Sequence, residues 1–147
     1  MSTVILLRIA AALAAIQGLA HGTLFVSAKP RYGAAEVAVV EAMKSNRFFA
    51  GGTRSYWDLY FGYGLIAAAA CLVEAVLLWQ LARIAESNPQ LVRPILGLLI
   101  LTNVGHALLV ARYFLFYVPI AFDALIAAFL AWAFIVAAAG ASPSRAT

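Results

Sequence analysis

Several side chains that can ionise lie in or beside stretches that are otherwise almost entirely apolar. Among them are His21, Asp58, Glu74, His106, Arg112 and Asp123. Carboxylates and histidines with shifted pKa values can act as general acids or bases. The same groups can hold the polar head of a mostly apolar ligand. No zinc spacing and no phosphate-binding loop accompanies them, so the residue types leave the chemistry open.

The composition explains why such groups are costly in this chain. Of its 147 residues, 65% are hydrophobic and 11% are charged, and the mean hydropathy is +0.96. A soluble domain is about half apolar and about a quarter charged. A chain of this size still exposes much of its surface, so the apolar excess predicts lipid as the solvent. The net charge of +4 is scattered over segment ends, which suits lipid headgroups better than nucleic acid.

Four apolar segments are long enough to be membrane helices, which need about 20 residues. They span about 4–26, 57–81, 94–115 and 119–139. The sequence therefore predicts an all-α membrane protein, a single integral domain over 1–147, in which four transmembrane helices form an antiparallel bundle.

The one long connection lies between the first two predicted helices and has helical character at about 33–50. Most of its charged residues fall on one half of a helical wheel. Two alternatives remain open: an interfacial helix that lies on the bilayer, and a helix that packs as a cap on the rest of the protein.

The second apolar segment begins with RSYWDLYFGYG, residues 54–64. Ser55 is a suitable N-cap and Asp58 suits the first turn, while the aromatic residues are typical of a membrane–water boundary. An alternative interpretation is the wall of a cavity, because Gly62 and Gly64 each cost about 1 kcal/mol relative to alanine in a helix. Close packing of another helix explains the glycines equally well.

An antiparallel arrangement brings polar residues of all four segments to one half of the bundle, while Glu74 is expected in the other half. The residues predicted to contact a ligand are His21, Tyr60, Tyr63, Glu74, Asn103, His106 and Tyr113. Arg112 is expected to form a structural ion pair with Asp123 or Asp58, since an unpaired buried charge is costly. Glu74 has an alternative role as a protonated carboxyl group hydrogen-bonded to a backbone carbonyl or to Asn103, which lies at about the same level.

Two histidines on different helices raise haem ligation as an option. No CxxCH motif is present, and each histidine is better explained as a hydrogen-bonded interior residue. The sequence predicts no cofactor and no metal site.

The stretches HGTLF, VVEAMKSNRFFAGGTRSYWDLYFGYGL and AVLLWQLA resemble a family of small bacterial membrane proteins with four predicted helices and no established activity. The resemblance covers most of the chain and is most specific at about 39–65. It implies a four-helix fold in a bacterial inner membrane, but no reaction. In layout alone the chain is similar to DoxX-like proteins and to the sterol isomerase and sigma-2 receptor group. That likeness implies a polar cluster that holds an apolar ligand, with no residue carried over.

Three functions compete. The first is a binding protein for an amphiphile such as a quinone, isoprenoid or sterol-like lipid, because small and aromatic helix faces surround a few polar groups. The second is an accessory subunit of a membrane complex, and the third is an intramembrane isomerase with carboxylate or histidine acid–base chemistry. Whether the protein is an enzyme stays open. The expected partners are membrane lipids, an apolar small molecule and either a second copy or another membrane subunit, without nucleic acid.

Overall fold

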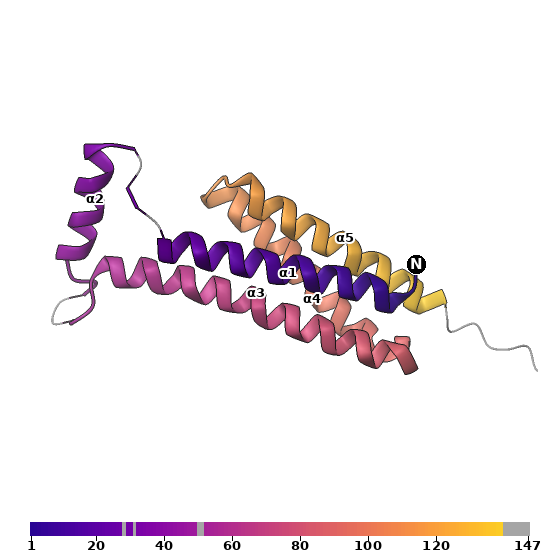
Figure 1. Ribbon diagram of the computed structural model, residues 1–147. Coiled ribbons are helices and arrows are strands. Elements are labelled where there is room, and N and C mark those ends of the chain that lie inside the picture. Colours follow the sequence, from indigo (N-terminus) through magenta and orange to yellow (C-terminus); the bar gives the residue numbers. More distant parts are fainter. Residues whose placement is uncertain (28, 31, 50–51, 140–147) are drawn as a thin grey trace, which may run out of the picture. The chain divides into compact units, whose positions relative to one another are not determined.

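A computed structural model describes residues 1–27, 29–30, 32–49 and 52–139. Its elements are the helices α1 (Thr3–Ser27), α2 (Ala34–Ser45), α3 (Tyr56–Ser87), α4 (Pro89–Tyr113) and α5 (Tyr117–Ala139) (Figure 1). The predicted all-α class is confirmed for this part of the chain. Helix α2 lies in the long connection and ends at Ser45, earlier than the predicted limit at residue 50, which falls outside the described residues.

Four of these helices, α1, α3, α4 and α5, are long and apolar enough to cross a membrane. Helix α3 extends to Ser87 and α4 begins at Pro89, so both are longer than the sequence predicts. The predicted start of the third segment at residue 94 is Pro94, which lies inside α4. Pro89 takes the opening position instead, where a proline has the backbone angle of the helix and the missing amide has no bond to lose.

The chain divides into two compact units. The first unit comprises Met1–Gln17 and Leu72–Thr147, and the second comprises Gly18–Cys71. Helices α1 and α3 are each divided between the two units, while α4 and α5 belong to the first.

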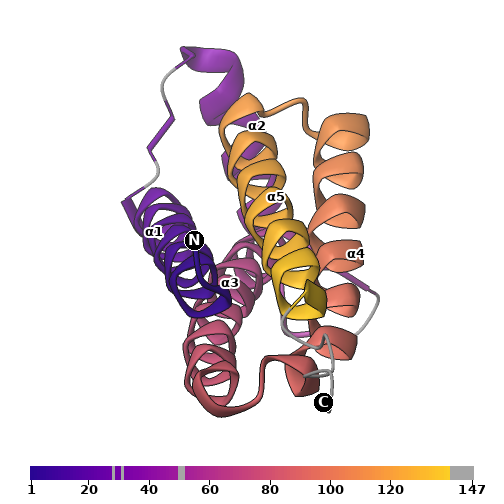
Figure 2. The same ribbon diagram turned by 90° about the vertical axis from the view of Figure 1, so that its right-hand side faces the viewer.

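The first unit holds the hydrophobic core. In it α4 and α5 lie side by side and are joined by a short turn (Figure 2). Large buried side chains from four helices meet there with small ones, which allow helices to approach closely. The largest fully buried members are Leu6, Leu7, Leu78, Leu96, Ile126 and Leu130, and the small ones include Ala10, Ala14, Ala82 and Ala133.

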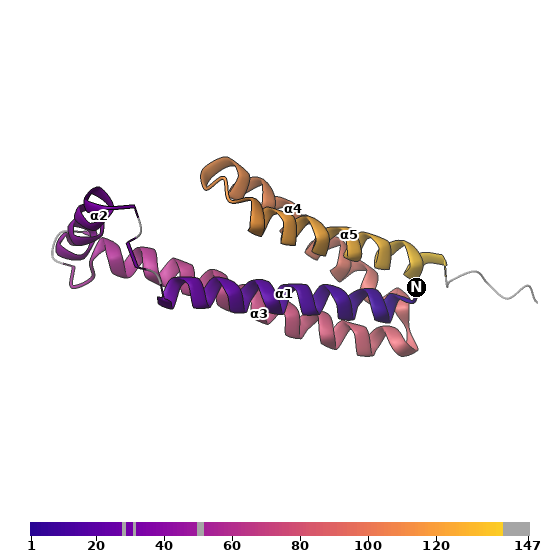
Figure 3. The same ribbon diagram turned by 45° about the horizontal axis from the view of Figure 1, so that its top comes forward.

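The second unit is held together at its loop end by backbone hydrogen bonds. The amide of Phe48 donates to the carbonyl of Arg54 at 2.9 Å, and the amide of Tyr56 donates to the carbonyl of Asn46 at 3.1 Å. These bonds close the loop between α2 and α3, so the end of α2 is attached to the start of α3 (Figure 3).

Helices α1 and α3 also pack closely within the second unit. A Cβ atom added to Gly64 would overlap the ring of Phe25, and one added to Gly22 would lie 3.5 Å from Ala68. Gly62, by contrast, has open space where its side chain would be. The two glycines of the opening stretch of α3 therefore differ: Gly64 makes room for a neighbouring ring, and Gly62 does not.

Candidate functional site

Asp123 is the centre of the polar network in the first unit. Its side chain is only 3% exposed, and it lies in the second turn of α5. One carboxylate oxygen, Oδ1, accepts a hydrogen bond from Nε2 of Gln17 at 2.9 Å, and Oδ2 lies 2.8 Å from Nδ1 of His106. This one carboxylate thus connects α1, α4 and α5.

The turn between α4 and α5 explains why His106 meets Asp123. His106 lies seven residues before the end of α4, and Asp123 lies six residues after the start of α5. At a rise of about 1.5 Å per residue, both are roughly 10 Å from the turn that joins the helices. Two neighbouring helices therefore bring the two side chains to the same level.

His106 differs from Asp123 in its exposure, since 46% of its side chain is accessible. Nδ1 is engaged by Asp123, and within the described residues Nε2 has no hydrogen-bond partner. In a neutral imidazole with its proton on Nδ1, Nε2 is an acceptor, whereas in the imidazolium both nitrogens are donors. The Asp123–His106 pair can therefore present either a lone pair or an N–H at the surface.

A second polar pair joins α3 to α4 in the same unit. Nδ2 of Asn103 donates to Oε1 of Glu74 at 2.6 Å and to the carbonyl oxygen of Leu99 at 2.9 Å. The hydrogen bond expected between Glu74 and Asn103 is thus confirmed. Asn103 and His106 are three residues apart, so both polar pairs lie on neighbouring positions of α4.

These two pairs give the first unit a small set of chemical capabilities. Both carboxyl groups have hydrogen-bond donors, and a proton can be shared between Asp123 and His106. Among the described residues, no group of three or more histidine, cysteine or acidic side chains is placed to hold a metal ion. The arrangement suits hydrogen bonding to a polar head and proton exchange with it.

Gln17 belongs to this network although the sequence predicted no role for it. It is 8% exposed and lies on α1, directly after the apolar run IAAALAAI at residues 9–16. An amide buried beside such a run must find a hydrogen-bond partner, and that requirement is the signal in the sequence. Its partner is not visible in the sequence, because Asp123 lies 106 positions away.

Among the described residues, Arg112 and Asp123 form no ion pair, although the sequence predicts one. Arg112 is exposed near the end of α4, where its guanidinium lies 5.3 Å from the ring centre of Tyr113. Six residues separate Arg112 from His106, so the two lie about 120° apart around the helix. The face of α4 that meets Asp123 carries His106, and Arg112 points elsewhere. Tyr113 is likewise exposed and contacts Arg112 instead of the polar pairs.

Asp58, the other predicted partner of Arg112, serves the start of α3 in the second unit. Its Oδ2 accepts a hydrogen bond from the amide of Ser55 at 2.8 Å, and its own amide donates to Oγ of Ser55 at 3.1 Å. This reciprocal arrangement is a capping box, so the predicted N-cap is confirmed.

The remaining predicted ligand contacts also belong to the second unit. Phe25 lies between His21 and Tyr60, with ring centres 4.8 and 5.3 Å away. Tyr63 is 66% exposed. The predicted set is thus divided: His21, Tyr60 and Tyr63 lie in the second unit, and Glu74, Asn103, His106 and Tyr113 in the first. A single site that includes both sets stays a prediction.

Comparison of the chain with protein-family models, with curated proteins and with solved structures gives no match. The resemblance found in the sequence therefore stays a prediction, and the function has to be inferred from the geometry of the polar pairs.

Proposed function

We propose that the protein is an integral protein of the bacterial inner membrane. Its four long helices cross the bilayer as an antiparallel bundle. Large apolar side chains that point away from the core support this proposal. On α4 and α5 alone, Leu98, Leu101, Leu108 and Ile135 are each at least 65% exposed. Apolar surface costs about 25 cal/mol per Å² in water, and lipid removes that cost. Soluble monomers rarely expose apolar surface over whole helices.

Within this membrane domain, we propose that His106 binds the polar head of an amphiphilic molecule. One observation carries the proposal: buried Asp123 holds a histidine that remains nearly half exposed on a largely apolar helix. In hydrocarbon, a polar group without a partner costs several kcal/mol. A ligand head that bonds to Nε2 removes this cost, and the tail of the ligand can lie along the apolar helix.

The chemistry of the pair defines which head groups fit. When His106 is neutral, Nε2 accepts a hydrogen bond from a hydroxyl group. When it is protonated, the Asp123 carboxylate stabilises the positive charge and Nε2 donates to a carbonyl oxygen. Quinones and their quinols, isoprenoid alcohols and sterol-like lipids all carry one of these groups at the end of an apolar body.

The test is lipid extraction and mass spectrometry of the protein purified from a bacterial membrane. The variant is His106→Phe, which keeps a ring and removes both nitrogens. The matched control is Leu109→Ala, which changes another exposed residue on the same helix. Because a hydrogen bond to a charged group contributes about 1.5–3 kcal/mol, the loss of affinity in His106→Phe should be about tenfold or more.

The expected result is an amphiphile enriched over the detergent blank in the wild type and in Leu109→Ala, but not in His106→Phe. If the wild type carries no enriched lipid, or if His106→Phe retains it fully, ligand binding at His106 is excluded.

A second candidate is an accessory subunit in which the polar groups only fix the helices against one another. The observation that favours it is that both carboxylates already have side-chain partners from other helices, Gln17 and His106 for Asp123 and Asn103 for Glu74. Under this alternative, His106→Phe lowers stability and leaves the bound lipids unchanged.

A further inference from the structure

Helix α2 and residues 46–49 form an exposed surface in the second unit. Helix α2 has twelve residues, none of them buried. Helices of this length are marginal in water on their own and are normally stabilised by packing of one face. A shallow apolar groove runs along this one, lined by Val39, Ala42, Met43, Asn46 and Tyr56. These residues are called the α2 surface below.

Aromatic side chains continue the α2 surface beyond the end of the helix. The ring centres of Phe48 and Phe49 are 5.6 Å apart, and those of Phe48 and Tyr56 are 6.0 Å apart, both edge to face. All three rings are exposed, Phe49 by 62%. The groove and the three rings share Tyr56, so they form one continuous apolar face.

Charged groups lie on the opposite side of α2 and beyond its end. Glu41 and Lys44 pair at 2.9 Å, and their positions lie about 140–200° around the helix from Val39. Nη1 of Arg47 donates to the carbonyl oxygen of Thr53 at 2.8 Å, and Arg54 is exposed. Aromatic rings beside basic side chains are the composition of a segment at a membrane–water boundary.

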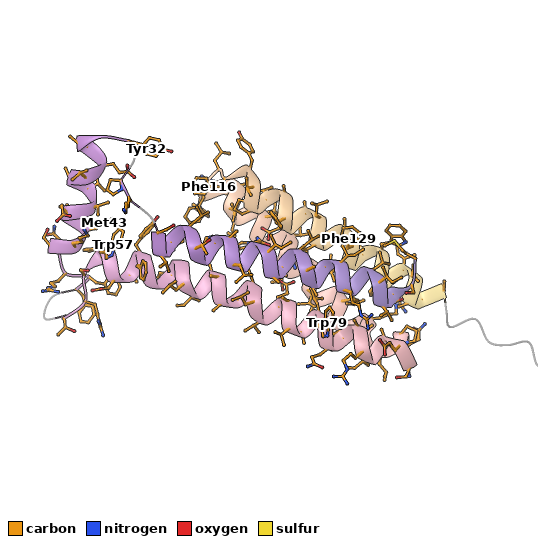
Figure 4. The ribbon with its side chains drawn as sticks, in the orientation of Figure 1. Tyr32, Met43, Trp57, Trp79, Phe116 and Phe129 are labelled. Carbon is orange, nitrogen blue, oxygen red and sulfur yellow. The ribbon has the colours of Figure 1, made fainter. Side chains whose placement is uncertain are left out.

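Backbone hydrogen bonds fix the position of the α2 surface relative to the start of α3. The amide of Tyr56, the first residue of α3, is bonded to the carbonyl of Asn46, the residue that follows α2. Figure 4 shows Met43 and Trp57 at this end of the unit, where α2 meets the start of α3. If α3 crosses a bilayer, as proposed above, its first residues lie at the boundary, and α2 is held there with them.

We propose that the α2 surface docks on the lipid bilayer itself, with its groove and the rings of Phe48 and Phe49 in the zone between headgroups and acyl chains. This inference rests on the membrane insertion of α3. The lipid completes the burial that α2 lacks within the chain, and the charged side of the helix remains in water.

The sequence supplies a direct probe, because its only two methionines are Met1 and Met43. Isotope labelling of methionine methyl groups therefore gives two NMR signals, one of them from the groove. The protein is placed as a single copy in phosphatidylcholine nanodiscs. A nitroxide on the acyl chain near the glycerol broadens methyl groups in the interfacial zone, and a water-soluble gadolinium chelate broadens those in water.

The variant Leu101→Met adds an internal reporter on α4, where Leu101 is 69% exposed. The exchange conserves volume and should leave the fold unchanged. A nitroxide near the end of the acyl chain broadens this methyl group if α4 is inserted. The reporter separates failure of membrane insertion, which overturns both proposals, from failure of docking alone.

The expected result is that the lipid nitroxide broadens Met43 and the gadolinium chelate does not. Val39→Ser should reverse this pattern, because it puts a hydroxyl group in the groove. Val37→Ser, the same change on the opposite side of α2, should leave it intact. If the chelate broadens wild-type Met43 while the reporter shows insertion, docking on lipid is wrong. Shielding of Met43 only in discs with two copies would overturn it in favour of self-association.

Discussion

The two units use the same kinds of polar residue over very different distances along the chain. In the first unit, Gln17 and Asp123 are 106 positions apart, and Asn103 and Glu74 are 29 positions apart. In the second unit, Ser55 bonds to Asp58 and Lys44 to Glu41, each three positions away. Long-range pairs fix how helices are rotated against one another, whereas local pairs fix where a helix begins and ends. Substitutions should therefore affect the two units to different degrees.

The largest effect is expected for Asp123→Ala. The substitution leaves Nε2 of Gln17 without its acceptor in the interior and removes the anchor of His106. An unsatisfied buried group costs about 1–3 kcal/mol. Because Gln17 and His106 both lose their partner, the free energy of unfolding should fall by about 3 kcal/mol. This free energy is measured by unfolding in mixed detergent.

Asp123→Asn is the appropriate control for volume. It retains one acceptor oxygen for Gln17 and should be intermediate between the wild type and Asp123→Ala. If the Asp123→Ala protein is as stable as the wild type, the long-range polar pairs of the first unit do not contribute more to stability than the local pairs of the second.

Packing in the second unit is tested next by Gly64→Ala. The new methyl group overlaps the ring of Phe25, and overpacking of this kind costs about 1–3 kcal/mol. Gly62→Ala is the matched control, because its methyl group meets open space. It should raise stability by up to about 1 kcal/mol through helix propensity. Changes of the same sign in both variants would contradict the close approach of α1 and α3.

The N-cap of α3 should contribute less to the free energy of unfolding than Asp123 or the packing at Gly64. Ser55→Ala removes the hydroxyl that accepts from the amide of Asp58, and loss of such a cap costs about 1 kcal/mol. A double-mutant cycle with Asp58→Ala measures the coupling between the two side chains, and additive effects would mean that the capping box is not formed in solution.

The sequence predicts local features of the fold better than contacts between residues far apart in the chain. Four apolar runs of sufficient length identify α1, α3, α4 and α5, and the capping box is visible because Ser55 and Asp58 are three residues apart. The level of a polar residue along a helix is also readable, which is how Glu74 and Asn103 were paired. Rotation about the helix axis is not readable when all sides are apolar, so the partners of Asp123 had to come from the structure. The start of α4 was misplaced because Pro94 and Pro89 both suit a first turn.

The smallest effect is expected for Arg112→Leu, which tests whether Asp123 has a charged partner. If Arg112 were paired with buried Asp123, its replacement would lower the free energy of unfolding by about 3–5 kcal/mol, the cost of breaking a buried ion pair. In the structure its guanidinium is exposed over Tyr113 instead. A surface substitution of this kind changes stability by less than about 0.5 kcal/mol. Arg112→Leu should therefore melt with the wild type under conditions in which Asp123→Ala is largely unfolded. A large loss in both variants, together with non-additivity in the double variant, would restore the ion pair and make Asp123 the partner of a charged residue in place of Gln17 and His106.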